Sequence, residues 1–217
     1  MLKALSKFSL NLSVLFLFFF SQALLSQAAQ QRLDGDTFML KANMNVQGSA
    51  MLYDDWQKAD LIDNNGSVVE GVLINYNGLE EALICKLDDG TMLQLNKYLY
   101  TKAVLGNSEL YNLTAYGATG YGKALFIGNN YQCFEKMTAT KTTTDSNGYN
   151  QIKDYYKIRK SNKTILKIGD RTMELKRSTK EFDKALPGMD IKGLVKANKL
   201  KLSKDEDLVH LLQLLDE

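Results

Sequence analysis

The chain has 217 residues, with 27 lysines and arginines, 25 acidic residues and one histidine. This length fits one domain with a sizeable core, and the balanced charge excludes the strongly basic chains that bind nucleic acid through their net charge. The two cysteines and the single histidine match no metal-ligand spacing. We therefore expect no nucleic-acid partner, no metal site and no cofactor.

The first residues have the pattern of a secretory signal. Two lysines precede a mostly apolar run over residues 10–25, and Ser26-Gln27-Ala28 places small residues where a signal peptidase cuts. The apolar run is shorter than the roughly 20 residues that a membrane-spanning helix needs. We predict a signal peptide over residues 1–28 and a single mature domain over 29–217, periplasmic or secreted, with no transmembrane segment after cleavage.

The charges of the mature chain are unevenly spread. Residues 29–128 carry 7 basic and 12 acidic residues, whereas residues 129–217 carry 18 basic and 13 acidic residues. One interpretation is a cationic surface for an anionic partner, such as a glycan or an envelope lipid. The other, which we favour, is an ion-paired contact between the two halves together with a solvated lysine-rich face.

Turn signals dominate the first half. Three turn dipeptides recur at intervals of twelve, and each suits a type I′ turn because Asn, Asp and Gly tolerate positive φ. They are Asn65-Gly66, Asn77-Gly78 and Asp89-Gly90. The segments 68–76 and 79–87 between them are rich in Val, Leu and Ile. The pattern predicts an antiparallel meander of about four strands between Trp56 and Leu95.

The same β pattern continues to residue 176. The further predicted strands are 98–105, 110–116, 123–127, 131–140, 155–159, 164–168 and 172–175. We expect Ser161-Asn162 and Gly169-Asp170 to be tight turns, and the polar stretch 142–148 to be an exposed loop. Residues 29–176 are therefore predicted to be mostly β.

The hydrophobic period changes in the C-terminal segment, residues 177–217, which we predict to be helical. Ser178-x-x-Glu181 and Ser203-x-x-Glu206 match the capping box, and Asp190 can cap a short helix between them. The last helix carries one apolar stripe, formed by Leu208, Leu211, Leu212 and Leu215. Strands followed by helices predict an α+β fold, with an antiparallel β-meander forming a sandwich or roll and short C-terminal helices packed on it.

The two cysteines leave two alternatives open. Cys85 and Cys133 both lie in strand-like segments and are expected to point into the core. An oxidising compartment would allow them to form a disulfide, and the alternative is two buried free thiols.

The candidate catalytic and nucleotide-binding motifs are weak. Gly117 to Lys123 fits the spacing G-x-x-x-x-G-K, but alanine follows where a P-loop needs Ser or Thr for magnesium, so we expect a bent strand there. The single histidine, His210, lies near the end of the chain, and no nucleophile elbow accompanies it. We therefore regard an enzyme as the less favoured class.

Two features could still serve a glycan. Tyr111, Tyr116 and Tyr121 lie among glycines and could form an aromatic surface for a sugar, although such tyrosines are more often half-buried strand residues. Three pairs of adjacent acids, Asp54-Asp55, Glu80-Glu81 and Asp88-Asp89, could include a catalytic carboxylate. Neighbours on a strand point to opposite faces, so adjacency in sequence alone makes no catalytic pair.

The mature chain resembles a group of uncharacterised exported, β-rich proteins of Bacteroidota-type bacteria. The residues that carry the resemblance are Tyr53-Asp-Asp-Trp56, Gly71-Val-Leu-Ile-Asn-Tyr76, Leu93 to Leu95, Lys196-Ala-Asn-Lys199 and Lys204-Asp-Glu-Asp-Leu208. The resemblance implies an envelope or secreted location, and it implies no activity and no catalytic residues. The function we expect is an exported, non-catalytic envelope or secreted module that binds another macromolecule, such as an envelope protein or a glycan, and the sequence does not identify this partner. The alternative is a glycan-directed hydrolase that uses a pair of acidic residues.

Overall fold

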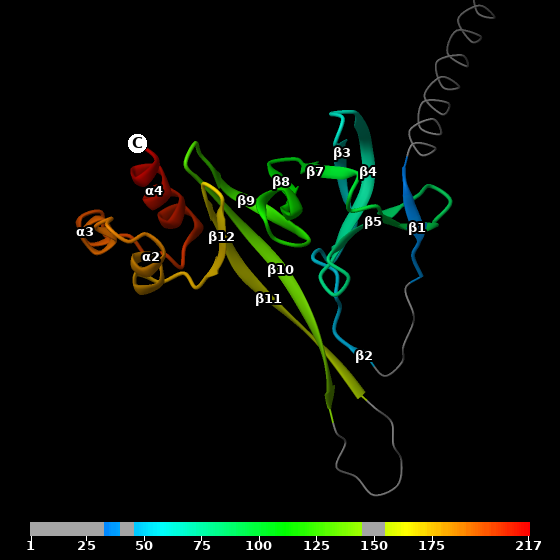
Figure 1. Ribbon diagram of the computed structural model, residues 1–217. Helices are drawn as coiled ribbons and strands as arrows, with labels where there is room; N and C mark the ends of the chain where they lie inside the picture. Colours follow the sequence, from blue (N-terminus) through cyan, green and yellow to red (C-terminus); the bar gives the residue numbers. More distant parts are fainter. Residues whose placement is uncertain (1–32, 40–45, 145–154) are drawn as a thin grey trace, which may run out of the picture.

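The computed structural model describes residues 33–39, 46–144 and 155–217 (Figure 1). The predicted signal peptide, residues 1–28, lies outside these ranges. The strands are β1 (Gly35–Thr37), β2 (Val46–Gln47), β3 (Gln57–Asp63), β4 (Val68–Asn77), β5 (Ala82–Lys86), β6 (Met92–Leu95), β7 (Tyr100–Leu105), β8 (Ser108–Asn112), β9 (Tyr121–Ile127), β10 (Tyr131–Thr144), β11 (Tyr155–Ile168) and β12 (Arg171–Leu175). The helices are a 3₁₀ turn η1 (Leu113–Tyr116), α2 (Thr179–Ala185), α3 (Ile191–Ala197) and α4 (Asp205–Asp216).

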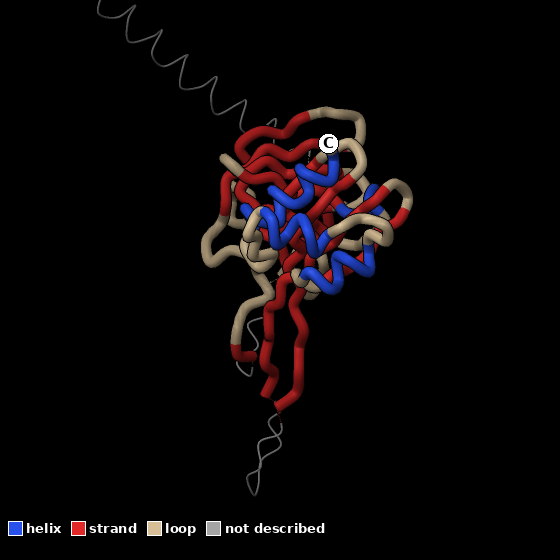
Figure 2. The backbone as a smooth tube through the Cα atoms, turned by 90° about the vertical axis from the view of Figure 1, so that its left-hand side faces the viewer, coloured by secondary structure: helices blue, strands red, loops and turns tan. Residues whose placement is uncertain are grey.

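The strands form one open sheet in the order β1-β6-β5-β4-β3-β7-β8-β9-β10-β11-β12, with β2 paired to β11. Every pairing along this order is antiparallel, and only β2 runs parallel to its neighbour. The predicted meander is confirmed as β3-β4-β5-β6. The α+β fold class is confirmed as well, because the three C-terminal helices pack on the β9–β12 end of the sheet (Figures 1 and 2).

A glycine bulge sets which face of β4 is buried. Gly71 has φ +69°, and its amide donates a hydrogen bond to the Asp60 carboxylate across the strand pair at 2.8 Å. The extra residue shifts the alternation, so that Val69 is buried before the bulge and Val72 after it. A strict alternation along the strand would have placed these two side chains on opposite faces.

The predicted turns occur where expected but not in the type I′ form. Asn65 does not adopt positive φ, because the Asp63 carboxylate accepts hydrogen bonds from the amides of Asn65 and Ser67, both at 2.8 Å. In the β4–β5 connection the positive φ falls on Glu81, at 53°, rather than on Asn77. Asn and Asp therefore shape these turns by accepting hydrogen bonds from the following amides.

The sheet curls so that the β4–β5 connection rests on β10. The Gly78 carbonyl accepts a hydrogen bond from the Ala139 amide at 3.1 Å, and Lys136 forms an ion pair with Glu81 at 2.6 Å. Burial alone would raise the pKa of Glu81, but the hydrogen bonds from Lys136 and Thr119 bring it below its usual range. This contact closes the curl around the larger core cluster, to which β3, β4, β5 and β7 contribute.

One turn that we expected from the sequence is part of the long strand β11 instead. Ser161-Asn162 is not a turn, because both residues pair with β10 inside a continuous ladder that runs from Tyr155 to Ile168. The hydroxyls of Ser161 and Thr138 lie 3.0 Å apart across this ladder. The polar side chains are tolerated in mid-strand because this part of the hairpin is exposed to solvent.

The helical layer is fixed to the sheet by Arg177. Its guanidinium donates to Glu135 on β10 at 2.8 Å, to Thr164 on β11 at 2.8 Å and to Asp205 on α4 at 2.5 Å. Ser178 caps α2 as the sequence predicted. The second capping box is wrong: α4 begins at Asp205, where the Arg177 contact replaces a side-chain cap.

Helix α4 contacts the sheet in two ways. Its leucine stripe packs on the strands, and the carboxylate of Asp216 at its end binds a turn of the sheet. Leu208, Leu211 and Leu212 are fully buried against β9–β12. Asp216 accepts hydrogen bonds from the amides of Asn130 at 2.7 Å and Asn129 at 2.8 Å in the β9–β10 turn. These backbone hydrogen bonds hold the pKa of the Asp216 carboxyl below its usual range.

The docked stripe makes α4 a test of this fold. Leu212→Ala should lower the free energy of unfolding by about 2–5 kcal/mol, because it empties a fully buried site. The control is Gln213→Ala on the exposed side of the same helix, which should change the free energy by no more than about 0.5 kcal/mol. Denaturant melts measure both. Equal, small shifts would mean that the helix does not dock.

Candidate functional site

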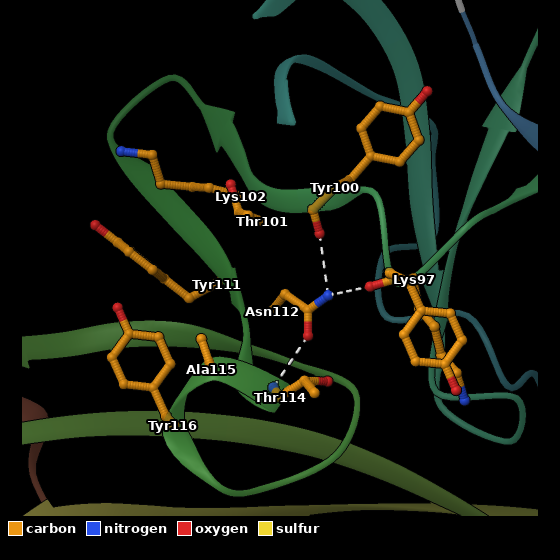
Figure 3. Close-up of a pocket in the computed structure, with 10 residues that line it drawn as sticks. Lys97, Tyr100, Thr101, Lys102, Tyr111, Asn112, Thr114, Ala115 and Tyr116 are labelled. Atoms are coloured by element: carbon orange, nitrogen blue, oxygen red, sulfur yellow. Dashed lines mark hydrogen bonds between the residues drawn. The ribbon is translucent and has the colours of Figure 1, made fainter. Parts of the chain in front are cut away.

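A pocket of about 440 Å³ opens beside the β7–β8 hairpin (Figure 3). Its walls come from the turn before β7, from β7 and β8 themselves, and from η1. The lining residues are Lys97, Tyr98, Tyr100, Thr101, Lys102, Tyr111, Asn112, Thr114, Ala115 and Tyr116. We call this site the Tyr–Lys pocket. None of its ten lining residues is acidic.

Asn112 holds the walls of the pocket together. Its side-chain amide donates to the carbonyl of Lys97 and, at 3.0 Å, to that of Tyr100, while its oxygen accepts from the Thr114 amide at 3.0 Å (Figure 3). The same side chain therefore caps η1 and fixes the turn that precedes β7. The Tyr121 hydroxyl adds a second donor to the Tyr100 carbonyl at 2.8 Å.

Two tyrosines form an aromatic wall with a rigid support. The rings of Tyr111 and Tyr116 meet edge to face, with centroids 6.0 Å apart. Both rings pack on the fully buried Phe134, at 5.8 Å from Tyr111 and 4.6 Å from Tyr116. Such a packed support keeps the exposed parts of the two rings in place.

Each of the three tyrosines that present their rings at this site has a lysine ammonium close to its ring. The distances to the ring centroid are 5.4 Å for Lys97 and Tyr98, 5.3 Å for Lys102 and Tyr111, and 5.5 Å for Lys167 and Tyr116. Ammonium groups within about 6 Å of an aromatic ring are attracted to its face. The pocket therefore combines flat apolar surfaces with positive charge.

The Glu109 carboxylate orients both Lys102 and Tyr111. Glu109 accepts hydrogen bonds from Lys102 at 2.8 Å and from the Tyr111 hydroxyl at 2.7 Å. The Lys102 hydrogen bond in particular holds the pKa of the Glu109 carboxyl below its usual range, and the same contact raises the pKa of Lys102. Both groups stay charged, and the hydroxyl end of Tyr111 is fixed in one direction.

The structure brings together two of the three tyrosines singled out from the sequence. Tyr111 and Tyr116 share the pocket wall, as the aromatic-surface hypothesis requires. Tyr121 does not belong to it: only 2% of its surface is exposed, and its ring meets Tyr76 in the larger core with centroids 6.2 Å apart. Tyr98, which no sequence pattern singled out, is 74% exposed at the edge of the pocket.

The P-loop-like segment has no phosphate-binding geometry. Gly117 ends η1 in the left-handed conformation, and Gly120 also has positive φ. Lys123 then lies in β9, paired with Leu110 and Glu135 on its two neighbours. A strand rather than a helix follows the glycines, but Gly117 and Gly120 lie in the turn between η1 and β9 and not in the bent strand that we expected. His210 is exposed on α4 and lies far along the chain from the pocket residues.

The two cysteines do not form the disulfide that the sequence left open. Cys85 and Cys133 are both free and fully buried, but they belong to different hydrophobic clusters. Burial raises the pKa of each thiol to about 12. At neutral pH both groups therefore remain protonated and serve as small apolar side chains.

Two of the adjacent acids, Glu81 and Asp89, make structural contacts. Glu81 pairs with Lys136, and Asp89 accepts a hydrogen bond from the Thr91 amide at 2.8 Å. Within the described ranges, no group of three or more His, Cys, Asp or Glu side chains is placed to hold a metal ion. Among the helices described, none combines the length and the apolar character needed to cross a membrane.

Comparisons with protein-family models, with curated proteins and with solved structures found no match to this chain.

Because Asn112 joins the walls of the pocket, its removal tests how the site is built. Asn112→Ala should lower the free energy of unfolding by about 1–3 kcal/mol, since it removes the donor to the Lys97 carbonyl, one of the two donors to the Tyr100 carbonyl and the cap of η1. Asn107→Ala, in the exposed β7–β8 turn, should cost no more than about 0.5 kcal/mol. Thermal or denaturant melts compare the two, and equal shifts would contradict the role of Asn112.

Proposed function

We propose that this chain is an exported, non-catalytic binding module that takes a glycan into the Tyr–Lys pocket. One observation carries the proposal: three tyrosine rings, at Tyr98, Tyr111 and Tyr116, line or border one pocket, and each is accompanied by a lysine. The pocket lies on a supported hairpin rather than on a free loop.

The shape and chemistry of the pocket suit a sugar. A sugar ring has an apolar face of C–H groups and a rim of hydroxyls, and tyrosine likewise combines an apolar ring with a polar tip. Ligand pockets typically measure about 300–1,000 Å³. A site of about 440 Å³ lies within this range. The exposed Thr114 hydroxyl and the lysine ammoniums can bond the rim. The Thr101 hydroxyl donates to backbone carbonyls of β3 and can act as an acceptor for the sugar.

The electrostatics favour binding over hydrolysis. A glycosidase needs two carboxyl groups that face one cleft, one of them with a raised pKa. The residues that line the pocket include no acid. In the part of the chain described, each carboxyl group with a shifted pKa is shifted downward, as hydrogen bonds favour its charged form; these groups are Glu81, Asp89, Glu109 and Asp216.

Export completes the proposal and rests on the sequence alone. The pattern over residues 1–28 predicts that the mature module lies in the periplasm or outside the cell, where glycans of the envelope are accessible.

The pocket assignment predicts the effect of one exposed ring. Binding of envelope oligosaccharides is measured by glycan array and then by calorimetry. Tyr98→Ala should weaken binding about five- to tenfold, because a stacked aromatic contact contributes about 1 kcal/mol. Tyr98→Trp should retain binding, since it keeps a flat ring.

The matched control is Met189→Ala, which truncates an exposed apolar side chain in the helical segment and should leave binding unchanged. All variants should keep the melting temperature, because Tyr98 is 74% exposed. Absence of binding to both neutral and acidic glycans, or binding that is indifferent to Tyr98→Ala, would reject the pocket as the site.

Export has a test of its own. Mass spectrometry of the protein recovered from the producing cell's envelope or medium should find an N-terminus at or next to Ala29. Recovery of the chain with Met1 still attached would contradict cleavage.

A further inference from the structure

The far half of the β10–β11 hairpin projects from the body of the protein (Figures 1 and 2). We call residues 137–144 of β10 and 155–163 of β11 the cationic arm. Its base is fixed by the hydrogen bond from Ala139 to Gly78 at 3.1 Å, and β2 pairs with β11 at Tyr156 and Lys157. The arm is thus a supported ribbon rather than an isolated hairpin, which would be marginally stable in water.

The arm carries a high density of positive charge. Its seventeen residues include five cations and no acid. The cations are Lys141, Lys157, Arg159, Lys160 and Lys163. Residues 129–217 as a whole have an excess of five positive charges, so the arm alone carries a charge equal to that excess. The first four of these cations are exposed.

Ion pairing within the described chain leaves most of this charge unmatched. Of the arm's cations, only Lys163 has an acidic partner among the described residues, Glu174 at 2.8 Å. A single described ion pair, Lys136–Glu81, joins the two halves of the chain. The ion-paired contact between the halves, one part of the interpretation that we favoured from the sequence, therefore does not account for the excess charge. The other part, a solvated lysine-rich face, agrees with the exposed cations of the arm.

The cations occupy both faces of the ribbon. Arg159 and Lys157 lie opposite Thr140 and Thr142, and they share one face. Lys160 and Lys141 alternate with them and lie on the other face. A membrane offers one plane of charge, whereas a flexible polymer can contact both faces of a ribbon. The exposed threonine hydroxyls between the cations can also bond the hydroxyls of such a polymer.

Protection of open strand edges does not explain the charge pattern by itself. Lysines on exposed edges do prevent unwanted strand pairing, but glutamates serve that purpose equally well. A ribbon that only needed protection could carry both signs. The uniform sign across the described arm is the property that calls for an anionic partner.

We propose that the cationic arm is a second binding surface, which takes an acidic polysaccharide chain along the β10–β11 ribbon. This surface is independent of the Tyr–Lys pocket, because no arm residue lines that pocket.

The experiment measures binding of the purified protein to polygalacturonate, with neutral dextran as the matched polymer and phosphatidylglycerol vesicles as the membrane probe. The triple variant Lys157→Gln, Arg159→Gln, Lys160→Gln removes three arm charges. The control triple Lys180→Gln, Lys196→Gln, Lys201→Gln removes three exposed charges from the helical segment. Both triples change the net charge equally, and both should keep the melting temperature because the side chains are exposed.

We expect polygalacturonate to bind and dextran not to bind, with affinity falling as salt increases. The arm triple should weaken binding about tenfold, since each exposed ion pair contributes a few-fold, and the control triple less than about twofold. Equal effects of the two triples, equal binding of dextran, or binding to the vesicles alone would overturn the proposal. Tyr98→Ala should not affect this binding, so failure of the pocket and failure of the arm are distinguishable.

Discussion

The strand pair β10–β11 contributes side chains to all three hydrophobic clusters, and the rest of the fold is arranged around it. Cys133 packs under the helices, Phe134 supports the pocket tyrosines, and Met137 belongs to the larger core. Side chains alternate along a strand, so one ribbon can serve layers on both of its faces. The same ladder continues outward as the cationic arm. This hairpin therefore supplies core residues, supports the pocket wall through Phe134 and forms the arm, so a shift in its register would disturb all three.

The sequence predicted the parts of this fold that local signals determine. The meander β3-β4-β5-β6 follows from closely spaced turn dipeptides, and the leucine stripe of α4 follows from its helical period. Local rules were wrong where a side chain forms a longer-range contact instead. Asp205 pairs with Arg177, so α4 starts beyond the Ser203 box. Gly71 shifts the alternation of β4 because its amide bonds Asp60 on the neighbouring strand.

The candidate site could be predicted only in part. Tyr111 and Tyr116 could be singled out because they are close in sequence, the first on β8 and the second in η1, which directly follows β8. Tyr121 has the same local setting, yet the curl of the sheet directs it into the core, and this direction depends on pairings with distant strands. Tyr98 lies in a short turn where no periodicity indicates exposure. The lysine beside Tyr116, Lys167, comes from β11 and is adjacent only in the folded chain.

The separation of Cys85 and Cys133 into different clusters has a consequence for how the chain must mature. Native packing keeps the two thiols apart and protonated, so the finished protein resists oxidation without using a disulfide. Before the two clusters form during folding, the same thiols are exposed and can pair with each other. Such a bridge would join strands that end in separate cores, and it would have to be reduced before either core could assemble. In an oxidising compartment, the chain therefore folds correctly only if the thiols are buried faster than they are oxidised.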